Sequence, residues 1–107
     1  MSEIKRGDIY WVAFDPAQGA EIQKTRPAIV LSNTLINRAR KTVIVVPLST
    51  SAPAITYLNV SLTGGSIARC DQIRAVAKIR LQNKIGIAHK KDLDAIANGL
   101  NHILDLV

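Results

Sequence analysis

The chain has 107 residues, a length that fits one domain, 1–107, with its own core. Its 14 Lys and Arg residues exceed its 8 Asp and Glu residues, and the net charge of +6 favours an anionic partner such as nucleic acid or an acidic protein. No apolar run reaches the roughly 18 residues that span a bilayer, and the charged start lacks a signal peptide's apolar core. We therefore expect no membrane contact. With Cys70 as the single cysteine, we expect the reducing cytoplasm.

The first predicted element is a strand at Asp8–Phe14, which is rich in aromatic and β-branched residues. Asp15 and Pro16 end it. Residues 16–26 then form a loop of about ten residues, longer than most connections. Long loops on compact domains often carry function, and this one contains several polar side chains.

The second predicted strand is Pro27–Ser32. Proline cannot donate to a sheet ladder, so Pro27 suits the first position of a strand. Arg26 is then expected at the strand mouth, at the end of the loop. There its planar guanidinium is either a phosphate contact or a solvated loop side chain.

The middle of the chain predicts a buried strand followed by hydroxyl residues. A basic connection at 33–41, with room for a helical turn, leads to Thr42–Val46, which is apolar and expected to be buried on both faces. Pro47 is expected to end this strand. Ser49 and Thr50 follow at the strand end, where such residues also form ordinary turns.

A hairpin is predicted next, with strands at Tyr57–Leu62 and Ile67–Val76 around a turn rich in glycine. Alternation along the second strand places Arg69, Asp71 and Ile73 on one face and Cys70, Gln72 and Arg74 on the other. The charged pair Arg69 and Asp71 is either a site or a surface ion pair worth under about 1 kcal/mol.

The C-terminal part predicts a short segment at Lys84–Ala88 and an amphipathic helix at Lys90–Val107, with apolar residues at spacings of three and four. The expected fold class is mainly β (α+β). It is a strongly curved antiparallel sheet, a small partly open barrel, closed by the C-terminal helix.

Several chemistries are not indicated. His89 and His102 lie far in sequence from the loop clusters, and no Cys/His set has metal-ligand spacing. No glycine-rich phosphate loop occurs, and Cys70 has no histidine near it, which favours a packed thiol over a nucleophile. The remaining Arg, Asp, Glu, Ser and Thr at strand ends suit phosphate chemistry without a metal or other cofactor.

Five short segments occur in an order and spacing that match one family: Arg6–Ile9, Phe14–Pro16, Gly19–Ala28, Val46–Thr50 and Arg69–Arg74. Through them the chain resembles the MazF/PemK (Kid) toxins of toxin-antitoxin systems. The resemblance implies a CcdB-like, SH3-like barrel that forms a homodimer through its sheet and terminal helix. It also implies cleavage of single-stranded RNA, chiefly messenger RNA, at short sequences. The implied partners are an acidic antitoxin and, through the antitoxin complex, operator DNA.

The family mechanism is metal-independent: the ribose 2′-OH attacks the adjacent phosphorus and leaves a 2′,3′-cyclic phosphate and a 5′-OH. By resemblance, the roles fall on eight residues. Arg26 stabilises the phosphoryl charge, Ser49 bonds a phosphoryl oxygen, and Asp71 or Glu21 is the base. The implied substrate contacts are Thr50, Arg69, Lys24 and Gln72.

Two departures from the PemK/Kid branch matter. Ala20 stands where that branch has a histidine, so Glu21 or Asp71 has to serve as the base. The hairpin between Val60 and Arg69 is also shorter, which affects substrate contacts and the sequence cleaved. The alternative is a non-catalytic toxin on the same fold, either an RNA binder or a gyrase inhibitor. The presence of Arg26, Ser49 and Asp71 together favours the enzyme, because a pure binder needs no candidate base.

Overall fold

The computed structural model describes residues 3–16, 18–21, 24–51 and 58–106. Within these ranges, the chain forms strands, two α-helices and two single turns of 3₁₀ helix. In order they are β1 (Asp8–Ala13), β2 (Thr25–Val30), α1 (Thr34–Ala39), β3 (Thr42–Ser49), β4 (Asn59–Ser61), β5 (Ile67–Arg69), η1 (Cys70–Gln72), β6 (Arg74–Ala77), η2 (Lys78–Arg80), β7 (Leu81–Ile87) and α2 (Lys90–Ile103).

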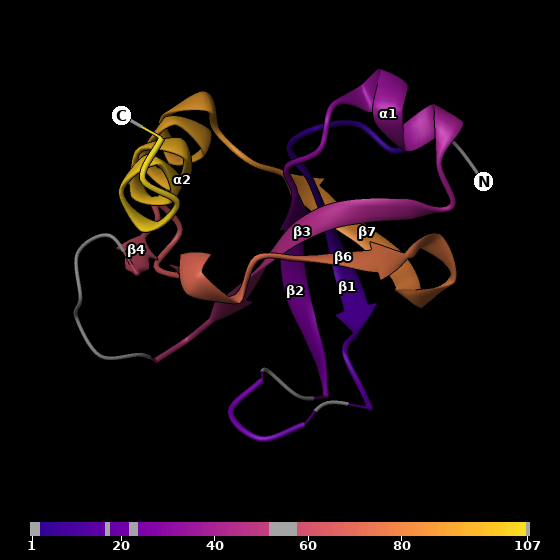
Figure 1. Ribbon diagram of the computed structural model, residues 1–107, viewed down its shortest axis with the longest axis horizontal. Coiled ribbons are helices and arrows are strands. Elements are labelled where there is room, and N and C mark those ends of the chain that lie inside the picture. Colours follow the sequence, from indigo (N-terminus) through magenta and orange to yellow (C-terminus); the bar gives the residue numbers. More distant parts are fainter. Residues whose placement is uncertain (1–2, 17, 22–23, 52–57, 107) are drawn as a thin grey trace.

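The strands form one antiparallel sheet in the order β4-β5-β3-β2-β1-β7, with β6 also paired to β3. β3 is central: β2 lies on one side, and β6 and then β5 lie on the other (Figure 1). Among the described residues no ladder joins β7 to β6 or β4, so the curled sheet is not closed. The predicted mainly-β fold with a C-terminal helix is confirmed.

Two hydrophobic clusters lie on opposite faces of the sheet. The interior cluster lies inside the curl and consists of Ile4, Tyr10, Val12, Phe14, Ala28, Val30, Val43, Val45, Val76 and Leu81. The other lies between the sheet and α2, which contributes the fully buried Ile96 to it. Alternating side chains of β1, β2 and β3 supply both clusters, because neighbours along a strand face opposite ways.

α2 is tied to the hairpin by a buried carboxylate. Asp92, in the first turn of α2, is 7% exposed and accepts hydrogen bonds from the Thr63 backbone N (3.0 Å) and Oγ1 (2.9 Å). The predicted helix at Lys90–Val107 is confirmed in type but ends at Ile103; Val107 lies outside the described residues. No helix in the described part of the chain has the length and apolarity to cross a membrane.

The expected start of the second strand was wrong. β2 begins at Thr25, so Pro27 is its third residue and Arg26 lies inside the strand. The Phe14 backbone N donates a hydrogen bond to the Lys24 carbonyl, just before β2 (3.0 Å). Backbone groups alternate between the two edges of a strand, so those of the even-numbered residues of β2 point toward β1. The nitrogen of Pro27 therefore points toward β3. Because the pairing of β2 with β3 begins only at Ala28, the N–H that proline lacks costs no hydrogen bond between these strands.

The expected end of the third strand at Pro47 was also wrong, because β3 continues to Ser49. The partners on one edge of β3 are β6, along residues 42–45, and β5, at residues 48–49. Pro47 falls in the gap between these two ladders. The strand is not buried throughout either, since Ile44 is 42% exposed.

The single strand predicted at Ile67–Val76 is interrupted by η1. β5 and β6 pair with successive parts of the same edge of β3, so the chain has to step between them. η1 makes this step and turns Cys70 into the cluster under α2. The predicted division of these residues between two faces is therefore wrong. The preceding strand spans only Asn59–Ser61, and its predicted start at Tyr57 lies outside the described residues.

Candidate active site

Arg26 is held within β2, directly opposite Val12 of β1, and its side chain is half-buried. Because side chains alternate along a strand, Arg26 shares a face with Ala28 and Val30, two fully buried residues of the interior cluster. Its guanidinium therefore starts from a fixed strand position at the rim of the interior.

Ser49 ends β3 on the same face of the sheet. Val45 pairs with Val30 of β2, and Ser49 follows Val45 by four residues. The Ser49 Oγ donates to the Ser51 carbonyl (2.7 Å) and accepts from the Ser51 backbone N (3.2 Å), as in an ordinary serine turn. The residue is 9% exposed, whereas the neighbouring Thr50 is exposed and lies beyond the strand.

Arg69, the last residue of β5, belongs to this face as well. Ser49 pairs with Ile67, and Arg69 follows two residues later, opposite Asn59 of β4. Its Nε is buried and has no hydrogen-bond partner among the described residues. An unmet buried donor costs on the order of 1–3 kcal/mol, and an anionic ligand would satisfy it.

Asp71 and Gln72 lie in η1 rather than on a strand. The Asp71 side chain is exposed and forms no ion pair with Arg69 in the described structure, so the predicted pair is not made. Gln72 is half-buried. Burial, and to a lesser extent the Asp71 charge, raises the pKa of the Cys70 thiol to about 11, which makes the thiol a poor nucleophile.

The loop between β1 and β2 holds Glu21 and Lys24. The Glu21 carboxylate accepts from the Gln18 backbone N (2.7 Å), so it stabilises its own turn. The Lys24 backbone has a positive φ of 66°, held by a bond from its N to Asp15 Oδ1 (2.9 Å), and its side chain is exposed. Among the contacts described, neither residue touches Arg26 or Ser49 directly.

Arg74 is a site residue that the sequence analysis did not select. It pairs with Val45 at the start of β6, so it shares the face of Ser49 and Arg26. Its guanidinium carbon lies 5.7 Å from the centroid of the Phe14 ring, within cation–π range. The sequence did indicate Arg74, because it is part of the family-matching segment Arg69–Arg74. The sequence analysis assumed one unbroken strand there and so placed Arg74 on the opposite face from Arg69.

We call the surface formed by Arg26, Ser49, Arg69 and Arg74 the arginine face. These residues come from β2, β3, β5 and β6, and the sheet brings them to one side at the rim of the interior. Three guanidiniums and a hydroxyl on one face can bind a phosphate and stabilise negative charge that develops on it. No group of three or more His, Cys, Asp or Glu residues that could hold a metal occurs in the described part of the chain.

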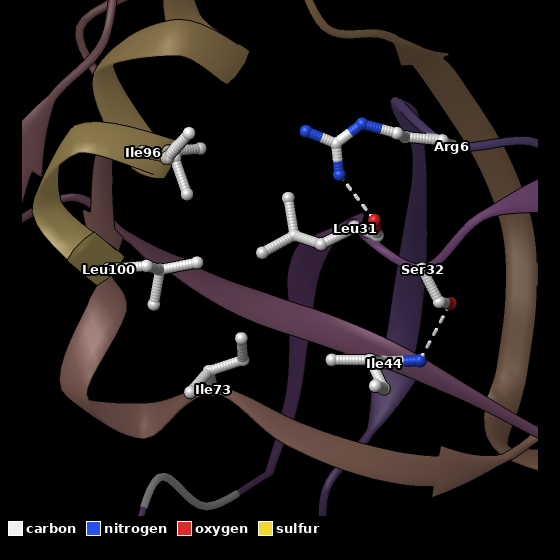
Figure 2. A pocket seen from close by; sticks show the side chains of 8 residues that line it. Arg6, Leu31, Ser32, Ile44, Ile73, Ile96 and Leu100 are labelled. Carbon is white, nitrogen blue, oxygen red and sulfur yellow. Dashed lines mark hydrogen bonds between the residues drawn. The ribbon is translucent and has the colours of Figure 1, made fainter. Parts of the chain in front are cut away.

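A groove of about 240 Å³ lies elsewhere, between α2 and β3 (Figure 2). Ile44, Ile73, Ile96 and Leu100 give it an apolar lining. Arg6, the one charged side chain among the described residues that line it, points its guanidinium at the Leu31 carbonyl. A second groove, of about 220 Å³, lies between the β4–β5 turn and the start of α2. Neither contains a residue of the arginine face.

The fold and the site together define a small protein of the mainly-β (α+β) class, with a curled antiparallel sheet, one C-terminal helix and an arginine-rich face. A family model of the PemK-like, MazF-like toxins of type II toxin-antitoxin systems matches residues 5–104. The chain belongs to this family, as the resemblance implied.

Relatives and structural neighbours agree. The chain is 33% identical to Endoribonuclease MazF9 of Mycobacterium tuberculosis, over 96% of this chain and 98% of the relative. It is 31% identical to Endoribonuclease toxin MazF of Escherichia coli K12, over 92% and 91%. The crystal structure of MazF from Deinococcus radiodurans superposes with a TM-score of 0.88 at 22% identity, covering 98% of this chain and 99% of that one. A mycobacterial endoribonuclease in complex with its cognate antitoxin has a TM-score of 0.82 at 21% identity, covering 97% of each chain. These two structures support the fold.

Proposed function

We propose that this chain is the endoribonuclease toxin of a toxin-antitoxin system, and that it cleaves single-stranded RNA, chiefly messenger RNA, at short sequences without a metal. The endoribonuclease activity follows from family membership and from the named activity of relatives at 31% and 33% identity. The observation that carries the chemistry is the arginine face, where three arginines from β2, β5 and β6 share one face of the sheet with the Ser49 hydroxyl of β3.

In the proposed reaction the ribose 2′-OH attacks the adjacent phosphorus, the bond to the 5′ oxygen breaks, and the products are a 2′,3′-cyclic phosphate and a 5′-OH. Arg26 clamps the phosphoryl oxygens as their charge grows, because a guanidinium stays protonated and offers paired donors. The Ser49 hydroxyl donates a hydrogen bond to a phosphoryl oxygen, and this bond replaces the one that it makes to the Ser51 carbonyl. The unmet Nε of Arg69 is a further donor for the same group.

Asp71 is the better supported of the two candidate bases. Its carboxylate is exposed and follows Arg69 by two residues, whereas the Glu21 carboxylate is engaged by the Gln18 backbone N–H. A carboxylate at this place can take the 2′-OH proton as the attack begins. Thr50, Lys24 and Gln72 are proposed as contacts to the flanking nucleotides.

The requirement for the 2′-OH provides the test. Once the cleavage site is mapped, an RNA with a single deoxyribose at that nucleotide should stay intact while the all-ribose RNA is cut. Cleavage of the deoxyribose substrate would overturn the mechanism. Binding without cleavage of either substrate, or inhibition of gyrase, would favour the non-catalytic alternative.

The proposed protein partner is an acidic antitoxin, which also links the pair to operator DNA. The net charge of +6 favours such a partner, and a structural neighbour is a complex of an endoribonuclease with its cognate antitoxin. Co-expression with an acidic protein encoded by a neighbouring gene should restore growth and yield a salt-sensitive complex. Failure of every such neighbour to bind would contradict this partner.

We also propose that the chain works as a homodimer. Leu104 and Leu106, at the end of the terminal helix, are 51% and 64% exposed, and Ile44 at the apolar groove is 42% exposed. Exposed apolar residues beside a groove are typical of an interface. Ile44→Asp should shift the molecular mass in light scattering from dimer to monomer without unfolding the chain. A wild-type monomer at micromolar concentration would contradict the proposal.

A further inference from the structure

Arg74 is the cation of the arginine face that the proposed mechanism does not use. It starts β6, on the far side of β3 from β2, yet its guanidinium lies over the ring of Phe14, the residue that follows β1, because the sheet is curled. In the described structure Arg74 makes no ion pair, and its guanidinium lies over the Phe14 ring. Its charge is therefore not neutralised by a neighbouring carboxylate.

Phe14 connects Arg74 to Arg26. Val12 is the partner of Arg26 in the β1–β2 ladder, and Phe14 follows Val12 by two residues on the same face. Diagonal neighbours of this kind lie about 7–8 Å apart, within reach of long side chains. The Arg74 guanidinium carbon lies 5.7 Å from the centroid of this fully buried ring, and Arg26 is the diagonal neighbour of the same residue in the β1–β2 ladder.

The ring also orders the guanidinium. Phe14 is 0% exposed, so its position is set by the interior cluster, and a cation resting on its face loses conformational freedom before any ligand arrives. A half-buried arginine that is ordered and has no acidic partner is well suited to bind a phosphate. The alternative is a purely structural role, in which the side chain only covers the ring.

We propose that Arg74 is a phosphate-contact residue of the RNA site, held by Phe14, and that it binds a phosphate flanking the one handled by Arg26. This inference rests on the proposed function for the class of substrate. Because Arg74 contacts a flanking phosphate and not the reacting one, its contact serves binding and positioning of the RNA, so its loss should raise KM more than it lowers kcat.

The decisive variant is Arg74→Met. Methionine keeps an unbranched side chain over Phe14 and makes a favourable sulfur–aromatic contact, so the cover of the ring is preserved while the charge is lost. Arg74→Lys retains the charge. Arg40→Met is the matched control, because Arg40 is an exposed arginine at the end of α1, outside the arginine face.

Binding is measured with single-stranded DNA of the mapped target sequence, which offers the same phosphates and cannot be cut through a 2′-OH. Arg74→Met should weaken binding about 10- to 100-fold at low salt. It should also reduce the slope of log K against log salt concentration by about 0.7. Arg74→Lys should recover part of the affinity, and Arg40→Met should stay within about twofold of wild type.

Neutral methylphosphonate linkages, placed one at a time in the DNA, locate the contact. At one flanking position the neutral linkage should weaken wild-type binding and leave Arg74→Met unchanged, which is the coupling expected of a direct contact. Equal binding and cleavage by Arg74→Met and wild type would overturn the inference, as would an equal loss in Arg40→Met. If the wild type leaves RNA uncut, the proposed function fails and no target is mapped; the same binding comparison, made with single-stranded DNA of mixed sequence, then still decides whether Arg74 contacts a phosphate.

Discussion

Replacing Arg26 with alanine removes the residue on which the proposed chemistry most depends. The residue is half-buried near the start of β2, and the fully buried residues that follow, Ala28, Ile29 and Val30, do not change. The side chain contributes no backbone bond to the β1 ladder. We therefore expect the fold to persist, with a loss of at most about 1 kcal/mol in the free energy of unfolding.

The catalytic loss should be much larger. A preorganised donor aimed at charge that develops in the transition state is worth about 2.7–4 kcal/mol, which corresponds to a 10²- to 10³-fold fall in kcat. Arg69 and Arg74 remain on the same face and still provide part of the positive potential at the phosphate. We therefore expect kcat to fall about 10²-fold rather than to zero. Arg26→Lys keeps the charge without the paired donors and should recover only part of the rate.

The assay is single-turnover cleavage of an RNA that carries the mapped site, at saturating enzyme, so that binding does not limit the rate. The free energy of unfolding of Arg26→Ala in urea should stay within about 1 kcal/mol of the wild type, and its antitoxin binding should match the wild type. A cleavage rate within twofold of wild type would refute the role given to Arg26, and lost antitoxin binding would indicate a disturbed fold instead.

Three further predictions concern carboxylates and the thiol. Asp71→Asn should lower single-turnover cleavage about 10²- to 10⁴-fold with unchanged RNA affinity if Asp71 is the base, and an unchanged rate would reject it. Asp92→Ala should lower the free energy of unfolding by about 2–3 kcal/mol in urea, because two hydrogen bonds to Thr63 are lost; Asp92→Asn should lose less. Because the pKa of Cys70 is about 11 in the fold, the free energy of unfolding should fall as pH rises from about 9 to 11, since the unfolded thiol ionises first. Cys70→Ala should lack that part of the decline, and an equal decline in both proteins would contradict the assignment.

Local patterns in the sequence were sufficient for the elements whose residues contact mainly one neighbour. The spacing of apolar residues predicts α2, and the β-branched run predicts β1, because each pattern reflects the single face that the element buries. The end of α2 was placed too late because Leu104 continues the apolar spacing yet lies on the surface, 51% exposed. In the sequence, apolar residues that a second chain would cover have the same spacing as apolar residues that pack inside the chain itself.

The errors arise where one strand has several partners. β3 pairs with β2, β5 and β6. Because β5 and β6 occupy successive parts of one edge of β3, Pro47 is tolerated in the gap between them, and η1 interrupts the segment after Arg69. No local signal reports such a change of partner. The same step brings Arg74 to the face of Arg26, so the error in secondary structure and the missed site residue have one cause.

Incubation of the purified chain in EDTA with a long single-stranded RNA, and with the same sequence as DNA, tests the central claim most directly. We predict discrete RNA cuts that bear 2′,3′-cyclic phosphate and 5′-OH ends, with the DNA intact. Uncut RNA in EDTA, or cuts with 5′-phosphate ends, would contradict a metal-independent attack by the 2′-OH.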